Sequence, residues 1–400
     1  MTPHLVNCNK LSARRCSSQF LVVMMAYLIL LLLLGSFYTR STTATATTAT
    51  TFISTSKLKA SYMNMIRCAS VRNETSDSPC TTSSTSSIIN ESIAWPSTSN
   101  PNHHHETTRE QERKETEQEL YQYLYNNLMP FDIPNAESLG FHMSPNDTNN
   151  SSLPDGLSSG IVGPTITLAL DAKRDYAWTN HVPKEIYFEY VASFGNVNEA
   201  RNNWRPLFHD ALLQSVIQPL ISMENNATVE QVIRAVNQNL WDQFYTKETI
   251  YFKSGQTPLI YDPMSIIAYG YASCTGVSIF LIDALRTVGI PARLAGTAAW
   301  NGKEENGNHS WIEFYGSDSQ WHIMESKPAS GGSGDEDDLW DPCQWWFCNG
   351  DKVEGTSFYA ARLDRVGSDG VVFPLAWDLD NDGVVGEDRT DFMRELCSRC

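Results

Sequence analysis

Residues 20–38 form a largely apolar run of nineteen residues without a charge. This run lies near the N-terminus, before every segment whose composition could form a water-soluble domain. Its length is close to the ~20 apolar residues that a helix needs to cross a bilayer. Because three basic residues lie just before it, we predict a cytosolic tail over 1–16 and a transmembrane signal anchor over 17–38. A cleaved signal peptide stays open as an alternative, although its apolar run is ordinarily shorter, about 7–15 residues. The remainder is expected to be luminal or extracellular, in a single-pass membrane protein of the secretory pathway or cell surface, or in a secreted protein.

The segment after this run cannot form a packed core. Between residues 41 and 100, 27 of the 60 residues are Ser or Thr, and large apolar side chains are few. Such a composition buries too little apolar surface to offset the entropy lost on ordering the chain. We therefore predict a disordered Ser/Thr-rich stalk over 39–108. Seven N-x-S/T triplets are consistent with a glycoprotein: Asn73, Asn90, Asn146, Asn149, Asn150, Asn226 and Asn308.

Apolar periodicity resumes near residue 109 and indicates helices. Three leucines spaced four apart mark one face of a helix: Leu120, Leu124 and Leu128. A polar gap follows, so residues 109–163 are predicted to be a helical segment and a linker. Further helices are expected over 184–194, 207–222 and 228–245. Thr228 and Gln231 fit a capping box at the start of the last of these.

The charge balance limits the classes of partner. The chain carries 29 Lys and Arg residues against 46 Asp and Glu, which gives a net charge of −17. Duplex nucleic acid is bound largely through basic side chains that contact its phosphates. The composition indicates no basic surface of that kind, so we expect no nucleic-acid partner.

One segment, 266–296, combines a cysteine with the start of an apolar helix. It runs from a Gly-containing turn into the helix, and then past Gly289 and Pro291 into a strand. Cys274 lies in the first turn, where free backbone N–H groups and the positive end of the helix dipole favour a thiolate. Four apolar side chains are expected to form a buried stripe: Val277, Phe280, Leu281 and Leu285. A buried, unreactive cysteine stays open as the alternative.

Two downstream residues make this cysteine a candidate nucleophile. His309 opens the strand-like segment H-S-W-I-E-F-Y, and after a turn the segment W-H-I-M-E ends in Glu325. In a thiol–imidazole–carboxylate arrangement, the imidazole takes the thiol proton, the carboxylate fixes the imidazole tautomer, and the thiolate attacks a carbonyl carbon. Cys274, His309 and Glu325 are therefore the predicted catalytic residues.

These segments resemble the transglutaminase-like superfamily. In that superfamily the nucleophile begins a helix, the His begins an H-x-W-x-E strand, and an Asp lies four residues after a Trp on the next strand. Here the fourth residue after Trp321 is Glu325, so Glu replaces the usual Asp. The stretches A-S-C-T-G at 272–276 and N-H-S-W at 308–311 are similar to a subgroup common in bacteria. The resemblance extends over residues 171–365.

The resemblance implies an α+β, papain-like core in which the Cys-bearing helix packs on an antiparallel sheet, and we assign it to residues 164–368. It also implies acyl transfer or hydrolysis at protein or peptide amides, through a thioester on Cys274 and with no required cofactor. The Cys274 backbone N–H would hold the oxyanion. The Gln256 side chain is a candidate second donor, and a polar loop residue without that role stays open as the alternative. A non-catalytic protein-binding module on the same scaffold, including a calcium-dependent one, stays open as the alternative.

The remaining cysteines on the expected luminal side favour disulfides. Their number is even once Cys274 is set aside, and an oxidising compartment promotes pairing: Cys68, Cys80, Cys343, Cys348, Cys397 and Cys400. A zinc site built from four of them is the alternative, although their spacing lacks the usual paired motif.

The last segment, 369–400, is predicted to be an acidic tail. Four of its residues match the first half of a calcium loop: Asp378, Asp380, Asp382 and Gly383. The backbone carbonyl of Val384 would be a further ligand, whereas position twelve is Arg389 instead of the bidentate Glu that such loops use. A calcium loop and a solvated acidic turn both stay open.

Overall fold

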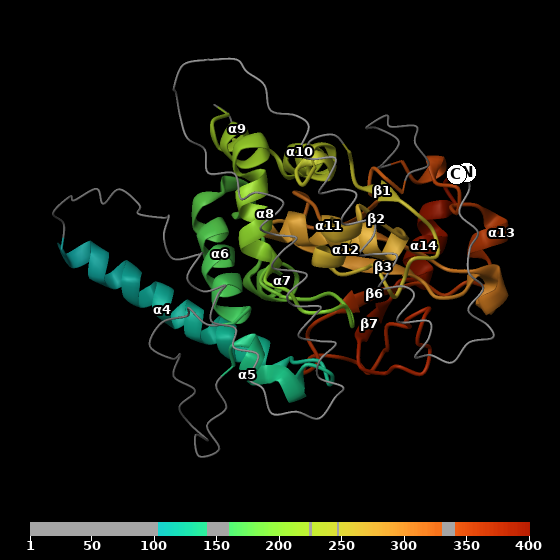
Figure 1. The fold of residues 1–400 in the computed structure, drawn as a ribbon, viewed down its shortest axis with the longest axis horizontal. Helices are drawn as coiled ribbons and strands as arrows, with labels where there is room; N and C mark the ends of the chain where they lie inside the picture. Colours follow the sequence, from blue (N-terminus) through green and yellow to red (C-terminus); the bar gives the residue numbers. More distant parts are fainter. Residues whose placement is uncertain (1–102, 142–159, 224–225, 246–247, 330–340) are drawn as a thin grey trace, which may run out of the picture. The chain divides into compact units, whose positions relative to one another are not determined.

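The computed structural model describes residues 103–141, 160–223, 226–245, 248–329 and 341–400 (Figure 1). All of them belong to the larger of two compact units, Ser54–Cys400. The predicted cytosolic tail, the signal anchor and most of the stalk lie outside the described residues, as do Cys68 and Cys80. Among the helices that the structure describes, none is both long and apolar enough to cross a membrane.

Helix α4 (His103–Asn126) opens the described part of the chain and packs along α6 (Val162–Asp175). The three predicted leucines are buried, although the helix ends before the last of them. An ion pair between Arg113 and Asp171, 2.7 Å apart, also joins the two helices. The short helix α5 (Ala136–Leu139) lies between them in sequence and contributes to the same core.

Four helices follow, in broad agreement with prediction: α7 (Lys184–Tyr190), α8 (Trp204–Leu212), α9 (Gln218–Ile221) and α10 (Val229–Asn239). A π-helical turn over Leu213–Ile217 joins α8 to α9, so the helix predicted over 207–222 is interrupted. Pro219 has no backbone N–H to donate to the preceding turn, which favours this irregular geometry. The predicted capping box is confirmed, because Thr228 and Gln231 exchange both of its hydrogen bonds.

Helix α12 (Cys274–Thr287) is the central element of the fold. It follows α11 (Pro263–Tyr269) and a parallel pair of two-residue strands, β1 (Tyr251–Phe252) and β2 (Tyr271–Ala272). Every side chain from 275 to 287 is buried, not only the predicted stripe. Helices α6, α8, α10 and α11 and the main sheet all contact α12 (Figure 1), which explains why it is largely apolar on every side.

The main sheet has five strands in the order β5-β4-β3-β6-β7, and every neighbouring pair is antiparallel. The strands are β3 (Ala292–Thr297), β4 (His309–Tyr315), β5 (Trp321–Met324), β6 (Tyr359–Arg362) and β7 (Val385–Asp388). Leu294 and Ile312 pack in the core around α12, whereas Ala295 and Trp311 belong to a second apolar cluster on the opposite face. The predicted α+β class with an antiparallel sheet is confirmed.

The segment predicted as an acidic tail completes this sheet. It supplies the edge strand β7 and helix α14 (Thr390–Cys397), so the folded unit continues past the predicted boundary at residue 368. Two disulfides tie the end of the chain to the loop before α13 (Gly350–Val353): Cys343–Cys400 and Cys348–Cys397. The disulfide prediction is thus confirmed for these four cysteines. The zinc alternative is wrong for them, because disulfide sulfurs are not thiolate ligands.

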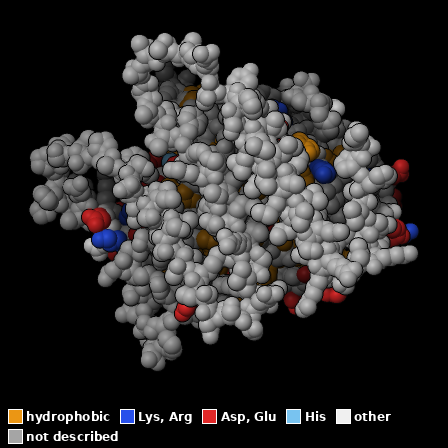
Figure 2. Space-filling model, in the orientation of Figure 1, with side chains coloured by type: hydrophobic (Ala, Val, Ile, Leu, Met, Phe, Trp, Pro, Cys, Tyr) orange, Lys and Arg blue, Asp and Glu red, His pale blue; other side chains and the backbone are white. Residues whose placement is uncertain are grey.

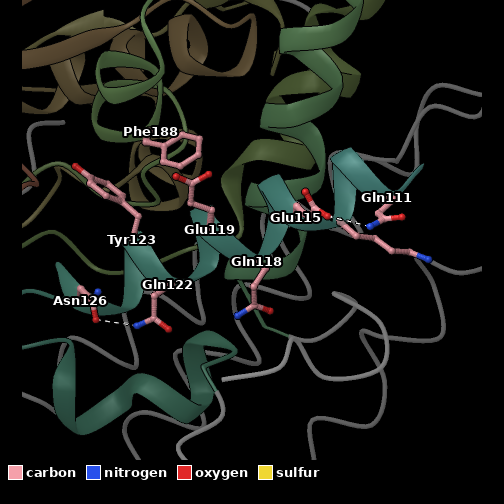
Figure 3. A pocket seen from close by; sticks show the side chains of 9 residues that line it. Gln111, Glu115, Gln118, Glu119, Gln122, Tyr123, Asn126 and Phe188 are labelled. Atoms are coloured by element: carbon pink, nitrogen blue, oxygen red, sulfur yellow. Dashed lines mark hydrogen bonds between the residues drawn. The ribbon is translucent and has the colours of Figure 1, made fainter. Parts of the chain in front are cut away.

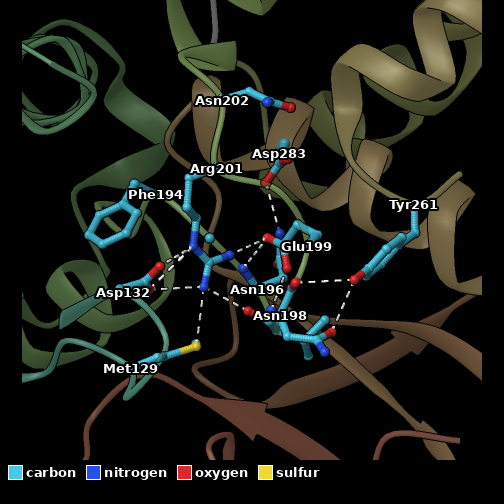
Figure 4. A network of polar contacts seen from close by, with 12 residues as sticks. Met129, Asp132, Phe194, Asn196, Asn198, Glu199, Arg201, Asn202, Tyr261 and Asp283 are labelled. Atoms are coloured by element: carbon cyan, nitrogen blue, oxygen red, sulfur yellow. Dashed lines mark hydrogen bonds and ion pairs between the residues drawn. The ribbon is translucent and has the colours of Figure 1, made fainter. Parts of the chain in front are cut away.

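A buried polar network around Arg201 connects α12 to the N-terminal helices (Figure 4). Arg201 pairs with Asp132 and with Glu199, at 3.0 Å in each case. Asn196 donates from its backbone N–H to Glu199 and from its side-chain amide to Asp283 of α12, at 2.6 and 2.9 Å. Buried charges are tolerated only with partners, so the network fixes where these segments can lie against α12.

The surface view agrees with the charge balance of the chain. On the face drawn in Figure 2, the visible Lys and Arg side chains lie singly or beside acidic ones. Apolar side chains show mainly in the recesses between them.

Phe280 of α12 tests how strongly the fold depends on this helix. Its ring lies 4.8, 6.0 and 5.6 Å from those of Phe208, Trp241 and Phe244. We expect Phe280→Ala to lower the free energy of unfolding by about 3–5 kcal/mol, because it leaves a cavity among packed rings. Phe252→Ala, which removes a partly exposed ring, should cost less than about 1 kcal/mol. Denaturant unfolding measures both, and equal losses would contradict the central role of α12.

Candidate active site

Cys274 is the first residue of α12 and the free cysteine among the residues that the structure describes. The preceding residue, Ser273, is the helix N-cap and has an extended backbone with φ −74° and ψ 179°. The first backbone N–H groups of a helix have no partner within that helix. The partly exposed thiol therefore lies at the positive end of the helix dipole, where the sequence places it.

His309, the first residue of β4, links this thiol to Glu325. Its Nε2 lies 2.7 Å from Oε1 of Glu325. The imidazole is also close enough to the Cys274 thiol to lower the pKa of that thiol. His309 and Glu325 are both buried, and Glu325 directly follows β5, the neighbour of β4. The structure thus brings all three predicted residues together. The Glu side chain, one methylene longer than the usual Asp, still reaches the imidazole.

Interactions among Cys274, His309 and Glu325 shift the pKa values of the thiol and the imidazole. Burial by itself raises the pKa of the Cys274 thiol, but the hydrogen bond and charge of His309, with the Ser310 backbone N–H, outweigh it and lower this pKa. Burial likewise lowers the pKa of His309, but the Glu325 charge and the bonds to Cys274 and Glu325 raise it to about 10. The thiol and the imidazole titrate as a coupled pair. Both shifts move the pair toward the thiolate–imidazolium form.

Two glycines allow the backbone to pass close to the triad. A Cβ at Gly276 would lie 2.5 Å from the Ala272 Cβ and 2.7 Å from the Ile260 carbonyl oxygen. At Gly296, β3 runs so close to β4 that a Cβ would collide with the His309 carbonyl. A side chain at either position would displace the segment that carries Cys274 or His309.

Two supporting residues escaped the sequence analysis. The buried Asn237 of α10 donates to the Glu325 backbone carbonyl at 3.4 Å and accepts from the Lys327 N–H at 3.1 Å. It therefore holds the chain on both sides of the carboxylate. Ser310 provides the backbone N–H that bonds to the thiol. Because Ser310 directly follows His309, its part in the site could have been predicted from the sequence. Asn237 lies 88 residues from Glu325, and no motif around it indicates a role in the site.

Aromatic rings pack around the imidazole. The ring centroids of Trp311, Trp346 and Phe347 lie 5.9, 5.2 and 5.0 Å from that of His309. Trp311 and Phe347 are buried, so they keep water away from one side of the ring. A low local dielectric strengthens the interaction between His309 and Glu325.

Gln256, the predicted second oxyanion donor, lies in the loop after β1. The hydroxyl of its neighbour Thr257 contacts the hydroxyl of Ser273, the residue before Cys274. This contact brings the loop to the N-terminus of α12. The part that Gln256 takes in holding an oxyanion stays a prediction.

The predicted calcium ligands do not converge. Asp378, Asp380 and Asp382 are exposed, and the Val384 carbonyl accepts a hydrogen bond from the Phe373 N–H at 2.9 Å. Strand β7 begins directly after this loop, and the regular element before the loop is strand β6, not a helix. In the described part of the chain, no group of three or more His, Cys, Asp or Glu side chains could hold a metal ion. Calcium binding at this loop stays a prediction.

A groove of about 700 Å³ runs along α4 (Figure 3). Polar side chains of α4 make up most of its lining, together with Tyr123 of the same helix and Phe188 of α7. None of the three candidate catalytic residues lines this groove. It is therefore separate from the candidate active site.

The sequence of the core matches a known family. The model of the transglutaminase-like superfamily matches residues 218–326, a segment that includes Cys274, His309 and Glu325. This segment is about a quarter of the chain, and over it the sequence is similar to that superfamily. The resemblance seen in the sequence motifs is thereby confirmed for this core. No curated protein matches the chain.

Two solved structures are similar to part of the chain. A TGase is 15% identical over 33% of this chain and 34% of its own, with a TM-score of 0.24. A proposed cysteine protease from Cytophaga hutchinsonii is 17% identical over 34% of this chain and 46% of its own, with a TM-score of 0.21. This chain therefore spans less than half the length of either structure.

The coupled pKa shifts predict how Cys274 reacts with iodoacetamide. A lowered thiol pKa leaves more thiolate at a given pH than an ordinary cysteine has, so alkylation should persist to lower pH. His309→Ala removes the interactions that lower this pKa, and each unit of the resulting rise cuts the thiolate fraction about tenfold below the pKa. We expect alkylation of this variant to be at least about tenfold slower at pH 6.5 and to approach wild type at high pH.

Mass spectrometry of the Cys274 peptide measures this rate against pH in the full chain. His322→Ala is the matched control, because His322 is half exposed and pairs with Asp318. Its alkylation profile should equal that of wild type. Identical profiles for His309→Ala and wild type would show that the imidazole does not activate the thiol.

Proposed function

We propose that this chain is a transglutaminase-like thiol enzyme, which transfers or hydrolyses acyl groups at protein or peptide amides through a thioester on Cys274. The connected arrangement of Cys274, His309 and Glu325 is the observation that carries the proposal. A thiol of lowered pKa that is hydrogen-bonded to an imidazole, itself held by a carboxylate, is the nucleophile and base that this chemistry requires.

The first half of the proposed reaction forms the thioester. The Cys274 thiolate attacks the amide carbonyl carbon, and a carbon–sulfur bond forms as the carbonyl electrons move to oxygen. The Cys274 backbone N–H stabilises this oxyanion, with the Gln256 side chain as the expected second donor. Protonated His309 then gives its proton to the amide nitrogen as the carbon–nitrogen bond breaks. An amine leaves, and the acyl group stays on sulfur.

The second half releases the acyl group. Water or an amine attacks the thioester carbon, and neutral His309 accepts the proton that the attacking group loses. The carbon–sulfur bond then breaks, and its electron pair returns to sulfur as the Cys274 thiolate. Water yields a carboxylic acid, whereas an amine yields a new amide. Glu325 stabilises the imidazolium in both halves and fixes the orientation of the ring. These steps require no metal or organic cofactor.

The alternative is a non-catalytic protein-binding module on the same scaffold. A binding module needs no activated thiol, whereas the Cys274 pKa is lowered by residues grouped around it. Perturbed pKa values of this kind concentrate at catalytic sites. This observation favours the enzyme.

We also propose that residues 17–38 anchor the protein in a membrane of the secretory pathway or the cell surface, with the candidate site on the luminal or extracellular side. The uncharged run at 20–38 supports an anchor. The two disulfides support an oxidising compartment for the rest of the chain. A secreted protein, formed by cleavage after the run, is the alternative.

Substitutions in the triad should separate its members by magnitude. Cys274→Ala should abolish acyl transfer, because no thioester can form. His309→Ala should lose about 10²–10⁴-fold in rate, the usual worth of general acid–base catalysis. Glu325→Gln should be impaired yet measurable, and Glu325→Asp should keep substantial activity, since Glu325 only orients the ring and stabilises its charge.

Two readouts cover both outcomes of the reaction: release of ammonia or amine from glutamine-containing peptides, and covalent incorporation of a labelled primary amine. Cys274→Ser is the conservative control for the fold, because it keeps the size and polarity of the side chain. Unchanged activity in Cys274→Ala would remove the mechanism. A rate for Glu325→Gln equal to wild type at every pH would remove Glu325 from it.

The proposed topology predicts protection of the folded body in sealed microsomes. Protease added outside should trim the N-terminal tail and leave the domain after residue 41 intact, because the membrane shields it. Immunoblotting with antibodies against the C-terminal region detects the protected fragment, and detergent should abolish the protection. Digestion of the domain without detergent would reverse the proposed orientation.

A further inference from the structure

An exposed tryptophan lies beside the candidate base. Trp346 is 54% exposed, and its ring meets the imidazole of His309 at a steep angle, with centroids 5.2 Å apart. Beneath it are Trp300 and Phe347, which are buried and lie 5.5 and 5.6 Å from Trp346. We call these three rings the aromatic platform; Trp346 is its exposed ring and lies next to the triad.

The chain holds the platform firmly. The two disulfides begin at Cys343 and Cys348, on either side of Trp346, and both lead to the C-terminal helix region. The Asn349 side chain also donates to the Trp346 backbone carbonyl at 3.0 Å. A surface that is already ordered loses little entropy when a ligand binds to it. The platform is therefore suited to binding and not only to covering the core.

The ammonium group of Lys352 lies beside the aromatic platform. Nζ of Lys352 lies 5.0 Å from the ring of Trp346 and 5.3 Å from that of Trp300. Among the residues that the structure describes, Lys352 forms no ion pair with a carboxylate. In a chain of net charge −17, this cation is the local group that can attract an anionic ligand to the platform.

The proposed reaction defines which part of a substrate can reach these groups. The nitrogen that leaves or attacks must come within about 2.6–3.2 Å of His309 to exchange a proton with it. The substituents on that nitrogen then lie within a few bond lengths of the imidazole, at the distance of the Trp346 ring. The acyl part of the substrate is instead attached to the sulfur of Cys274.

From this geometry we infer that Trp346 and Lys352 determine specificity on the amine side of the substrate, for a peptide with an aromatic side chain next to the reacting nitrogen and a carboxylate close behind. Trp346 stacks with the aromatic side chain, and Lys352 pairs with the carboxylate. Both residues lie outside the family match at 218–326. The inference rests on the proposed function.

Short amines that mimic this side of the substrate test the inference without turnover. The probes are three dipeptides amidated at their C-termini: Phe-Asp, Ala-Asp and Phe-Asn. Each is added to the full chain, in detergent and without reductant, and its binding is read from the slowing of Cys274 alkylation by iodoacetamide. We expect Phe-Asp to protect at concentrations about 3- to 10-fold lower than Ala-Asp, the usual worth of one aromatic pair.

Substitutions assign this preference to individual residues. Trp346→Ala should abolish the preference for Phe-Asp over Ala-Asp, and Trp346→Phe should keep part of it. Lys352→Gln should reduce only the preference for Phe-Asp over Phe-Asn, by about 2- to 5-fold, since an exposed ion pair contributes little. Val366→Ala, which removes an exposed apolar side chain elsewhere, should change neither preference.

The outcomes separate the inference from the proposed function. Equal protection by Phe-Asp and Ala-Asp in wild type, or a preference that survives in Trp346→Ala, would overturn the inference even if acyl transfer is found. Selective protection that is lost in Trp346→Ala supports it, even if no acyl transfer is detected with any substrate.

Discussion

The burial of α12 is the constraint on which the rest of the structure depends. A helix with no solvent-facing side chain between 275 and 287 must be covered on every side, and the surrounding helices and the sheet provide that cover. Its C-terminal end is fixed by Arg205, a buried guanidinium that donates to the Arg286 carbonyl at 2.7 Å. Arg286 in turn donates to the carbonyls of Ala292 and Gly195, at 3.0 Å each. With that end fixed, Cys274 at the other end has a defined position against β4.

The opposite face of the sheet is held by charge. Arg293 of β3 pairs with Glu313 of β4 at 2.7 Å and with Glu387 of β7 at 2.6 Å, and Arg389 adds a contact of 2.9 Å to Glu313. Removing one partner from a buried pair of this kind usually costs about 3–5 kcal/mol, because it leaves the other charge without compensation. This explains how an acidic C-terminal segment can complete a folded sheet and need not be a solvated tail.

The candidate active site forms where two apolar clusters meet. Cys274 comes from the helix at the centre of the larger cluster, while His309 lies against Trp311 and Phe347 of the smaller one. The disulfides belong to the smaller cluster, through Cys348 and Cys397. Covalent ties far from the thiol in sequence therefore help to position the rings beside the imidazole. The same arrangement leaves the Trp346 ring exposed beside the imidazole.

Local patterns in the sequence were sufficient to predict the elements that carry the triad. The apolar run after Cys274, the alternation after His309 and the capping box at Thr228 each depend on neighbours within a few residues, so they can be read without the fold. Spacing and motif resemblance also identified Glu325 in the place of the usual Asp. The membrane anchor and stalk lie outside the described residues and stay predictions of the same local kind.

Other features were decided only by the tertiary structure. Asn237 reaches Glu325 across 88 positions, and Trp346 lies at His309 because two disulfides and a second apolar cluster bring its loop there. The loop at 378–384 looked like half of a calcium site, but the sheet takes the Val384 carbonyl and leaves the acids in solvent. Each of these outcomes depends on which distant segments meet, and that is set by the packing of the whole fold, which no local pattern encodes.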